Sequence, residues 1–148
     1  MIFPEGENRM SQTSTTAPAD YRFWTEEKLR NADTDQQGHV NNAIFATFFE
    51  AGRMDLLAGP EIAAIRAATN IVVVRTVINF KKELFYPGTV RIGTRVARIG
   101  RTSLDFAHVI VSANGEVADS EATIVLLDQA TRKPTPIPER LRVYLTGQ

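Results

Sequence analysis

The sequence predicts an α+β fold in which one long helix covers one face of an antiparallel sheet. Apolar side chains cover most of the circumference of the helix predicted over residues 42–57, which indicates that neighbouring elements enclose it. Residues 71–127 then show strand patterns separated by short turns, and strands joined by short turns pair in antiparallel fashion. With one further strand before the helix, we expect a sheet of about five strands.

The N-terminal third of the chain supplies the first strand and the long helix. Residues 1–20 are rich in Ser, Thr, Pro and Glu and are expected to form a mobile tail, which leaves residues 21–148 as a single domain. Residues 21–30 alternate between apolar and polar side chains, a pattern typical of a strand. Asn41 or Asn42 is the expected N-cap of the long helix.

The remainder of the chain reads as a short helix followed by four strands. Gly59-Pro60 ends the long helix, and residues 61–68 are expected to form a second, shorter one. Asn114-Gly115 is the clearest hairpin signal, because this pair suits a type I′ turn. The expected strands lie at 71–83, 90–97, 104–111 and 116–127, with turns at 86–88 and 100–101 and a short helix at 139–145.

Length and composition restrict the class of protein. The 148 residues suit one domain, and 17 basic residues balance 17 acidic ones, which argues against a general nucleic-acid or membrane-surface binder. The chain has no cysteine, so disulfides, thiolate metal sites and a cysteine nucleophile are excluded. We find no apolar run long enough to span a bilayer and no signal-peptide pattern. A cytoplasmic protein is therefore expected.

The most informative segment is the loop Asp33-Thr34-Asp35-Gln36-Gln37-Gly38-His39-Val40-Asn41-Asn42. It places two carboxylates, a histidine and a glycine directly before the predicted start of the long helix. A helix N-terminus has unpaired N–H groups and a partial positive charge, so it can bind an oxyanion or polarise a carbonyl. A carboxylate just upstream could act there as nucleophile or base. The loop therefore predicts an acyl-transfer site.

This loop, in this position, resembles that of the hotdog-fold acyl-CoA thioesterases of the 4-hydroxybenzoyl-CoA thioesterase type. The resemblance continues through Phe48-Phe49-Glu50-Ala51-Gly52-Arg53, Phe80-Lys81-Lys82-Glu83-Leu84, Tyr86-Pro87-Gly88 and Ile99-Gly100-Arg101-Thr102-Ser103, and it covers roughly residues 21–127. It implies a curved antiparallel sheet wrapped around one long central helix. It also implies hydrolysis of an acyl-CoA thioester to a carboxylic acid and free CoA, without a cofactor.

The resemblance assigns roles to individual residues. The catalytic carboxylate falls on Asp35, with Glu50 in the helix as a second candidate because some relatives carry it there. The helix N-terminal amide that polarises the carbonyl falls near Asn42. The expected substrate-binding residues are Gly38, His39, Val40, Asn41 and Asn42. Independently of the resemblance, CoA carries phosphates that require cationic partners, and among the basic residues near the strand ends Lys82 and Arg101 are the expected CoA-binding residues. A tyrosine is common in the family where this chain has Phe45, so one hydroxyl is missing from the first helical turns.

Each of these residues also has an ordinary structural interpretation. Asp35 could be a turn residue or helix cap, and His39 could hydrogen-bond within the loop to fix its shape. For Glu50, an ion pair with Arg53 three residues later is slightly favoured over a catalytic role. His108 is interpreted as structural. The two histidines are far apart and follow no metal-ligand spacing, so no metal site is expected.

Two other functions on the same fold remain open at the level of sequence. One is a non-catalytic module that binds or senses acyl-CoA, and the other is a hydratase or dehydratase. The family resemblance further implies a homodimer with sites between protomers, and dimers that can pair into tetramers. The nature of the acyl group is not indicated by the sequence.

Overall fold

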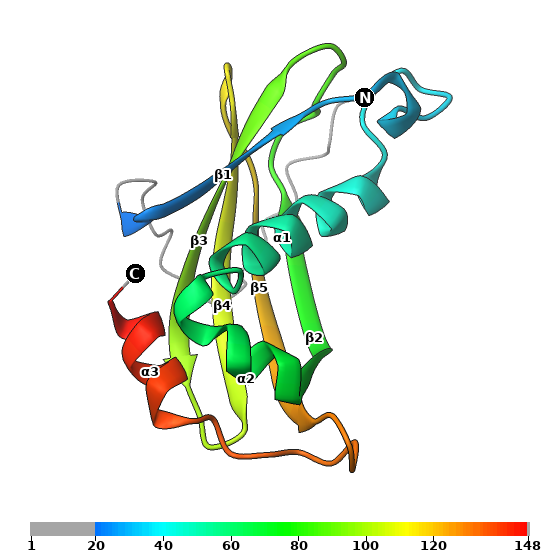
Figure 1. The fold of residues 1–148 in the computed structure, drawn as a ribbon. Helices are drawn as coiled ribbons and strands as arrows, with labels where there is room; N and C mark the ends of the chain where they lie inside the picture. Colours follow the sequence, from blue (N-terminus) through cyan, green and yellow to red (C-terminus); the bar gives the residue numbers. More distant parts are fainter. Residues whose placement is uncertain (1–19, 148) are drawn as a thin grey trace, which may run out of the picture.

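The computed structural model describes residues 20–147, and the predicted tail lies outside them except for Asp20. Figure 1 shows one sheet of five strands with helix α1 crossing one of its faces. The strand order is β1-β3-β4-β5-β2, and every neighbouring pair is antiparallel. The strands are β1 (Phe23–Lys28), β2 (Thr69–Phe80), β3 (Thr89–Ile99), β4 (Ser103–Ser112) and β5 (Gly115–Asp128).

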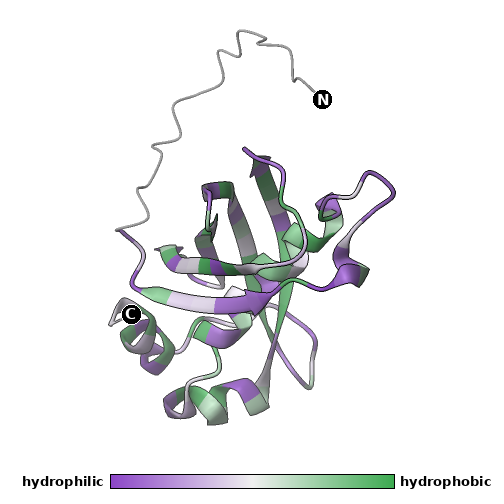
Figure 2. Cartoon of the chain, turned by 90° about the horizontal axis from the view of Figure 1, so that it is seen from above, coloured by the Kyte–Doolittle hydropathy of each residue, from purple (hydrophilic) through white to green (hydrophobic). Residues whose placement is uncertain are grey.

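The predicted α+β class, the five strands and their order along the chain are confirmed. Hydrophobic and hydrophilic residues alternate along the strands, as the colour bands of Figure 2 show. The turn at Asn114-Gly115 joins β4 to β5, and Gly115 adopts a φ of +96°, a backbone conformation that glycine tolerates at little cost. The turn at Tyr86-Pro87-Gly88 precedes β3 and contains a cis peptide bond before Pro87.

Helix α1 (Asn42–Leu56) begins where the sequence predicts. Asn41 is its N-cap, and the Asn41 side chain accepts a hydrogen bond of 2.9 Å from the N–H of Ala43. The face that carries Phe45, Phe49 and Leu56 is buried against the sheet. The opposite face is exposed, so the expected enclosure of the whole helix does not hold for the single chain. Small or polar residues occupy that face: Ala43, Ala46, Thr47 and Glu50.

Two short helical segments close one end of the sheet. A 3₁₀ turn, η3 (Pro60–Ile62), leads into α2 (Ala63–Ala68), which continues directly into β2. Helix α3 (Glu139–Thr146) packs against this end, and its Tyr144 hydroxyl donates a 2.7 Å hydrogen bond to the carbonyl of Leu56. The sequence predicted one helix at 61–68, where the structure has η3 followed by α2, and another at 139–145, where it has α3. The predicted bounds agree with the observed ones to within one residue.

The space between α1 and the sheet is divided into three zones. One apolar cluster surrounds the N-terminal half of α1 and includes Phe45, Phe49 and Ile110. A second surrounds its C-terminal end and includes Leu56 and Phe106. Buried polar residues lie between them on three neighbouring strands: Thr94 on β3, His108 on β4 and Ser120 on β5, which are direct cross-strand neighbours.

Candidate functional site

The loop between β1 and α1 has a defined backbone conformation. Thr34 and Val40 form an isolated antiparallel bridge, so the loop closes on itself. Within it, the N–H of Asp35 donates to the carbonyl of His39 over 3.0 Å, and the N–H of Gly38 donates to the carbonyl of Asp35 over 3.1 Å. Gly38 has a φ of +83°, which a residue with a side chain adopts only with strain. The glycine therefore permits the turn that brings Asp35 and His39 together.

The Asp35 carboxylate lies at the mouth of this turn and is partly exposed. Its Oδ1 accepts a hydrogen bond of 2.9 Å from the N–H of Gln37. Its Oδ2 lies 3.3 Å from Nδ1 of His39, and the same ring nitrogen lies 3.4 Å from the carbonyl of Val40. These contacts fix the carboxylate in one orientation while leaving it accessible. His39 thus lies beside Asp35, which is compatible both with a role in fixing the loop and with contact to a substrate.

The start of α1 lies immediately after the turn. Val40 is buried, and its N–H donates to the carbonyl of Leu84 over 2.7 Å, which anchors the loop to the segment before β3. The N–H of Asn41 donates to the carbonyl of Asp33, and its side chain caps the helix. The N–H of Asn42, the first helical residue, has no acceptor among residues 20–147. A donor of this kind is available to a ligand oxygen.

Asp33, the other carboxylate of the loop, is a structural residue. It is only 1% exposed and accepts hydrogen bonds from the backbone N–H, Nε and Nη2 of Arg30. Burial acts to raise the pKa of Asp33, but the hydrogen bonds and charge of Arg30 prevail and lower it. Because its oxygen atoms are occupied, Asp33 shapes the loop and Asp35 is the carboxylate that faces outward.

Glu50 is not brought to Asp35 within one chain. It is exposed on α1, eight residues beyond Asn42, which corresponds to about 12 Å along the helix axis. The favoured ion pair with Arg53 does not form within 4 Å, since Arg53 turns into the core and is 5% exposed. Burial lowers the pKa of Arg53, and the charge of Glu50 partly opposes that shift.

The two residues expected to bind CoA lie in different connections between strands. Lys82 donates through Nζ to the carbonyl of Asn114 over 2.9 Å, at the β4–β5 hairpin. Arg101 is exposed in the β3–β4 turn, where its carbonyl accepts a hydrogen bond from the N–H of Ile137. That turn lies at the opposite end of the sheet from the start of α1 (Figure 1). Lys82, by contrast, is two residues before Leu84, whose carbonyl accepts the hydrogen bond from the N–H of Val40 in the loop.

One neighbour of the site was not identified from the sequence. The ring of Phe85 meets the ring of His39 edge-on with 6.4 Å between centroids, although Phe85 is half exposed. The turn at Tyr86-Pro87 is the signal that could have pointed to Phe85. Leu84 is hydrogen-bonded to the loop, and because the chain turns directly afterwards, Phe85 stays beside the loop.

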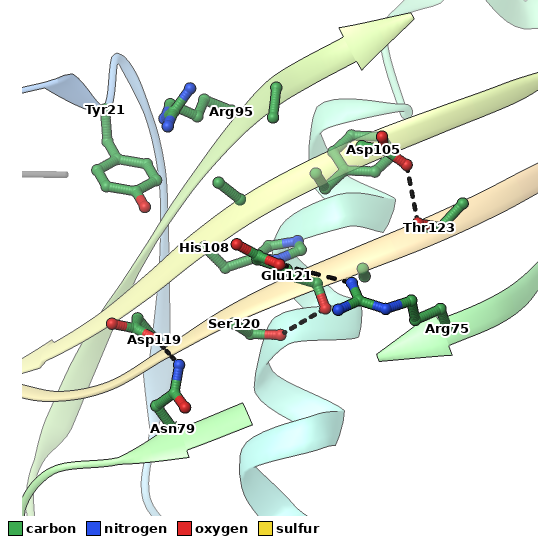
Figure 3. A pocket seen from close by; sticks show the side chains of 14 residues that line it. Tyr21, Arg75, Asn79, Arg95, Asp105, His108, Asp119, Ser120, Glu121 and Thr123 are labelled. Carbon is green, nitrogen blue, oxygen red and sulfur yellow. Dashed lines mark hydrogen bonds and ion pairs between the residues drawn. The ribbon is translucent and has the colours of Figure 1, made fainter. Parts of the chain in front are cut away.

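The sheet face that points away from α1 holds a separate cavity of about 290 Å³. Figure 3 shows the polar and charged side chains that line it, several of which bond to one another. Asn79 donates to Asp119 over 2.7 Å, and Thr123 donates to Asp105 over 2.8 Å. Because these carboxylates are already paired and lie across the sheet from α1, this cavity is not the acyl-transfer site.

Neither a metal centre nor a membrane-spanning helix is found in the described part of the chain. Within residues 20–147, no group of three or more His, Asp or Glu side chains is arranged to hold a metal ion. None of the helices in these residues combines the length and the apolar character that crossing a bilayer requires.

The geometry supports one kind of chemistry. A fixed, accessible carboxylate at Asp35 and a helix N-terminus with a free N–H at Asn42 are separated by a short, internally bonded turn. The first can attack a carbonyl carbon or activate water, and the second can donate a hydrogen bond to the carbonyl oxygen and stabilise the negative charge that develops there. These are the two functions that acyl transfer requires.

Comparisons with known proteins agree with this chemistry. A family model described as the thioesterase-like superfamily matches residues 29–145. A predicted thioesterase from Bacillus stearothermophilus has 31% identity and a TM-score of 0.76, over 84% of this chain and 94% of that one. A thioesterase from Thermus thermophilus, complexed with coenzyme A and Zn, has 25% identity and a TM-score of 0.76, over 86% and 93%.

A DHNA-CoA thioesterase from Staphylococcus aureus has 26% identity and a TM-score of 0.69, over 76% of this chain and 78% of that one. These neighbours share the fold of the chain, a curved sheet with its central helix. The family model begins directly after β1 and extends over the loop before α1, the helix and the other four strands. The protein is therefore a hotdog-fold member of the thioesterase-like superfamily.

Proposed function

We propose that the protein hydrolyses acyl-CoA thioesters, with Asp35 as the reacting carboxylate and the N-terminus of α1 as the group that polarises the thioester carbonyl. Membership of the thioesterase-like superfamily makes the protein a thioester hydrolase. The observation that carries the finer proposal is the accessible Asp35 carboxylate held one short turn before the free N–H of Asn42.

The proposed reaction needs little beyond these groups. A thiol has a pKa near 8.5, so a thiolate leaves more easily than an alkoxide and the protein need not protonate it strongly. Asp35 either attacks the carbonyl carbon or removes a proton from an attacking water molecule. A well-placed oxyanion donor contributes roughly 10²–10³-fold in rate, which is the contribution we assign to the amides at the start of α1. Gly38, His39 and Val40 shape the wall of the site.

The CoA portion of the substrate requires cationic partners for its phosphates. Lys82 and Arg101 are our candidates. Since Arg101 lies at the opposite end of the sheet from the start of α1, it would serve a site completed by a second protomer. The Thermus neighbour, which was solved with coenzyme A, supports CoA as the thiol carrier.

A homodimer is also part of the proposal. β2 is an edge strand of 12 residues, and Val73, Val74 and Phe80 on it are about half exposed. A long apolar edge is a site for pairing with another strand. Pairing of two β2 strands would extend the sheet across both protomers and cover the exposed face of α1. Two such dimers could then associate into a tetramer.

Release of free thiol from short-, medium-, long-chain and aromatic acyl-CoAs tests the proposal. We expect the purified protein to release thiol catalytically from at least one of these classes. Acyl-CoA binding, measured by calorimetry, without turnover of any substrate would instead support a binding or sensing module. Hydration of an enoyl-CoA without thiol release would support a hydratase.

A further inference from the structure

The loop before α1 and the segment before β3 lie side by side, and together they place one aromatic ring beside the candidate site. The N–H of Val40 donates to the carbonyl of Leu84 over 2.7 Å, and the side chains of both residues are buried. Adjacent side chains point to opposite sides of an extended backbone. The neighbouring residues His39 and Phe85 therefore point outward, and their rings meet edge-on with 6.4 Å between centroids.

Packing into the core does not account for the position of Phe85. It is 53% exposed, and it belongs to neither of the apolar clusters that surround α1. Among residues 20–147, the one ring that the ring of Phe85 meets is the imidazole of His39. The side chain of His39 is only 20% exposed, although it lies on the outward side of the loop. The contact with Phe85 is thus one of the contacts that cover the imidazole.

The contacts of the imidazole determine which of its nitrogens carries a proton. Nδ1 of His39 lies 3.3 Å from Oδ2 of Asp35 and 3.4 Å from the carbonyl oxygen of Val40. An ionised carboxylate and a carbonyl can only accept hydrogen bonds, so Nδ1 must be the donor. His39 is then the second of two donors that hold the Asp35 carboxylate. The first is the N–H of Gln37, which donates to Oδ1 over 2.9 Å.

The chain holds these two donors with different firmness. The N–H of Gln37 belongs to the backbone of the turn, whereas the imidazole of His39 rotates about its side-chain bonds. A rotation that took Nδ1 away would leave Oδ2 of Asp35 without a donor and let the carboxylate turn. Asp35 contacts the imidazole through Nδ1, and Phe85 meets the same ring edge-on, so the two neighbours together restrict this rotation.

We propose, on the basis of the function proposed above, that Phe85 is a positioning residue for thioester hydrolysis. It holds the imidazole of His39 with Nδ1 towards Asp35 and thereby keeps the reacting carboxylate in one orientation. Phe85 acts through His39 and not on the thioester. Loss of its ring should therefore lower kcat and leave KM unchanged, because fewer molecules hold Asp35 in the reactive orientation while substrate binding stays the same.

The test is a double-mutant cycle, measured with the acyl-CoA of the panel above that wild type hydrolyses fastest. Phe85→Leu keeps an apolar side chain but removes the ring, and it is made both in the wild-type chain and in His39→Ala. Phe85→Tyr keeps the ring. Tyr86→Leu is the matched control, because Tyr86 is the next residue, is 46% exposed and makes no ring contact with His39. Thermal unfolding and light scattering check the fold and oligomeric state of each variant.

We expect Phe85→Leu to lose about 3–10-fold in kcat at unchanged KM. This loss corresponds to about 0.7–1.4 kcal/mol, within the range that one aromatic edge contact contributes. Phe85→Tyr and Tyr86→Leu should stay within twofold of wild type. In His39→Ala, which has no imidazole to position, Phe85→Leu should have no further effect.

Three kinetic results would overturn the inference. A loss that persists in the His39→Ala background, or one that appears as a higher KM, would mean that Phe85 contacts the substrate directly. An equal loss in Tyr86→Leu would assign the effect to the turn and not to the ring of Phe85. A changed oligomeric state in Phe85→Leu would identify a partner chain as the group that Phe85 contacts.

A spectroscopic measurement separates this inference from the proposed function. The chain has two histidines, His39 and His108, so the imidazole nitrogen shifts of the untagged protein give two sets of signals, which His108→Leu assigns. At pH 8 we expect His39 to carry its proton on Nδ1 in wild type and in Phe85→Tyr, and to lose this preference in Phe85→Leu. A tautomer that Phe85→Leu leaves unchanged overturns the inference. Absence of thiol release from every acyl-CoA refutes the proposed function, whatever the tautomer.

Discussion

Acidification from pH 7 to pH 5 should destabilise this protein through His108. The His108 side chain is fully buried between the rings of Phe49 and Phe106, and neither ring nitrogen has a hydrogen-bond partner in the described chain. Burial, and after it the charge of the nearby Arg53, lower the pKa of His108 to about 3, against an opposing contribution from the Ser120 backbone. The folded protein therefore keeps the imidazole neutral.

The sign and size of the effect follow from linkage. In the unfolded chain the imidazole binds a proton near pH 6.5, whereas in the folded state it does so only near pH 3. Between those values the unfolded state holds one proton more, so the free energy of unfolding decreases as the pH falls, by up to about 1.36 kcal/mol per pH unit. Between pH 7 and pH 5 the loss assigned to His108 is about 2 kcal/mol.

Urea titrations of wild type and His108→Leu at pH 7, 6 and 5 measure this loss directly. Leucine has no proton to bind, so the variant should lose about 2 kcal/mol less than wild type over this range. Arg30 and Arg98 lower the pKa values of Asp33 and Asp105, so protonation of these two carboxylates in acid also reduces the free energy of unfolding. That reduction is the same in both proteins. Identical pH dependence in the two proteins would refute the claim that His108 is held neutral by burial in the core.

Three further predictions concern the helix and the sheet edge. Gly52→Ala should destabilise the protein by about 1–3 kcal/mol in a urea titration, because an added Cβ would lie 2.4 Å from Oγ1 of Thr94. Adding Thr94→Ala to the same chain should restore part of this loss. Asn41→Ala removes the N-cap of α1 and should cost about 0.5–2 kcal/mol by the same measurement, and no change would mean that the cap is dispensable. Val74→Glu should convert the proposed dimer into a monomer by light scattering, whereas Val143→Glu, also on an exposed valine, should not; a dimer that survives Val74→Glu excludes the β2 edge as the interface.

The sequence was sufficient for the secondary structure because local signals are strong in this chain. Asn114-Gly115 and Gly100-Arg101 fix hairpins between strands that are neighbours in the sheet, so their pairing follows from chain order. The position of β2 beside β5 rather than beside β1 could not be derived in this way. It depends on packing between elements far apart in the sequence, for which no turn residue gives a signal.

The contacts of the candidate site that join residues close in the sequence could be predicted, whereas those that depend on tertiary packing were missed. Asp35, Gly38, His39 and Asn41 lie within seven positions, and the turn and the cap among them have known residue preferences. The contact of Phe85 with His39 depends on how two distant loops pack. Arg53 was expected to pair with Glu50, but its side chain lies in the core near His108, and helix spacing alone does not determine which of the two positions is buried.

Hydrolysis of the thioester by the Asp35 carboxylate is tested most directly by kcat for thiol release. The measurement compares wild type, Asp35→Asn and Glu50→Gln, with thermal unfolding as the check that each variant is folded. Each substitution removes a charge and keeps the shape of the side chain. We predict that Asp35→Asn loses at least about 10²-fold in kcat and that Glu50→Gln stays within a few-fold of wild type. A folded Asp35→Asn protein with wild-type kcat would contradict the assignment of Asp35.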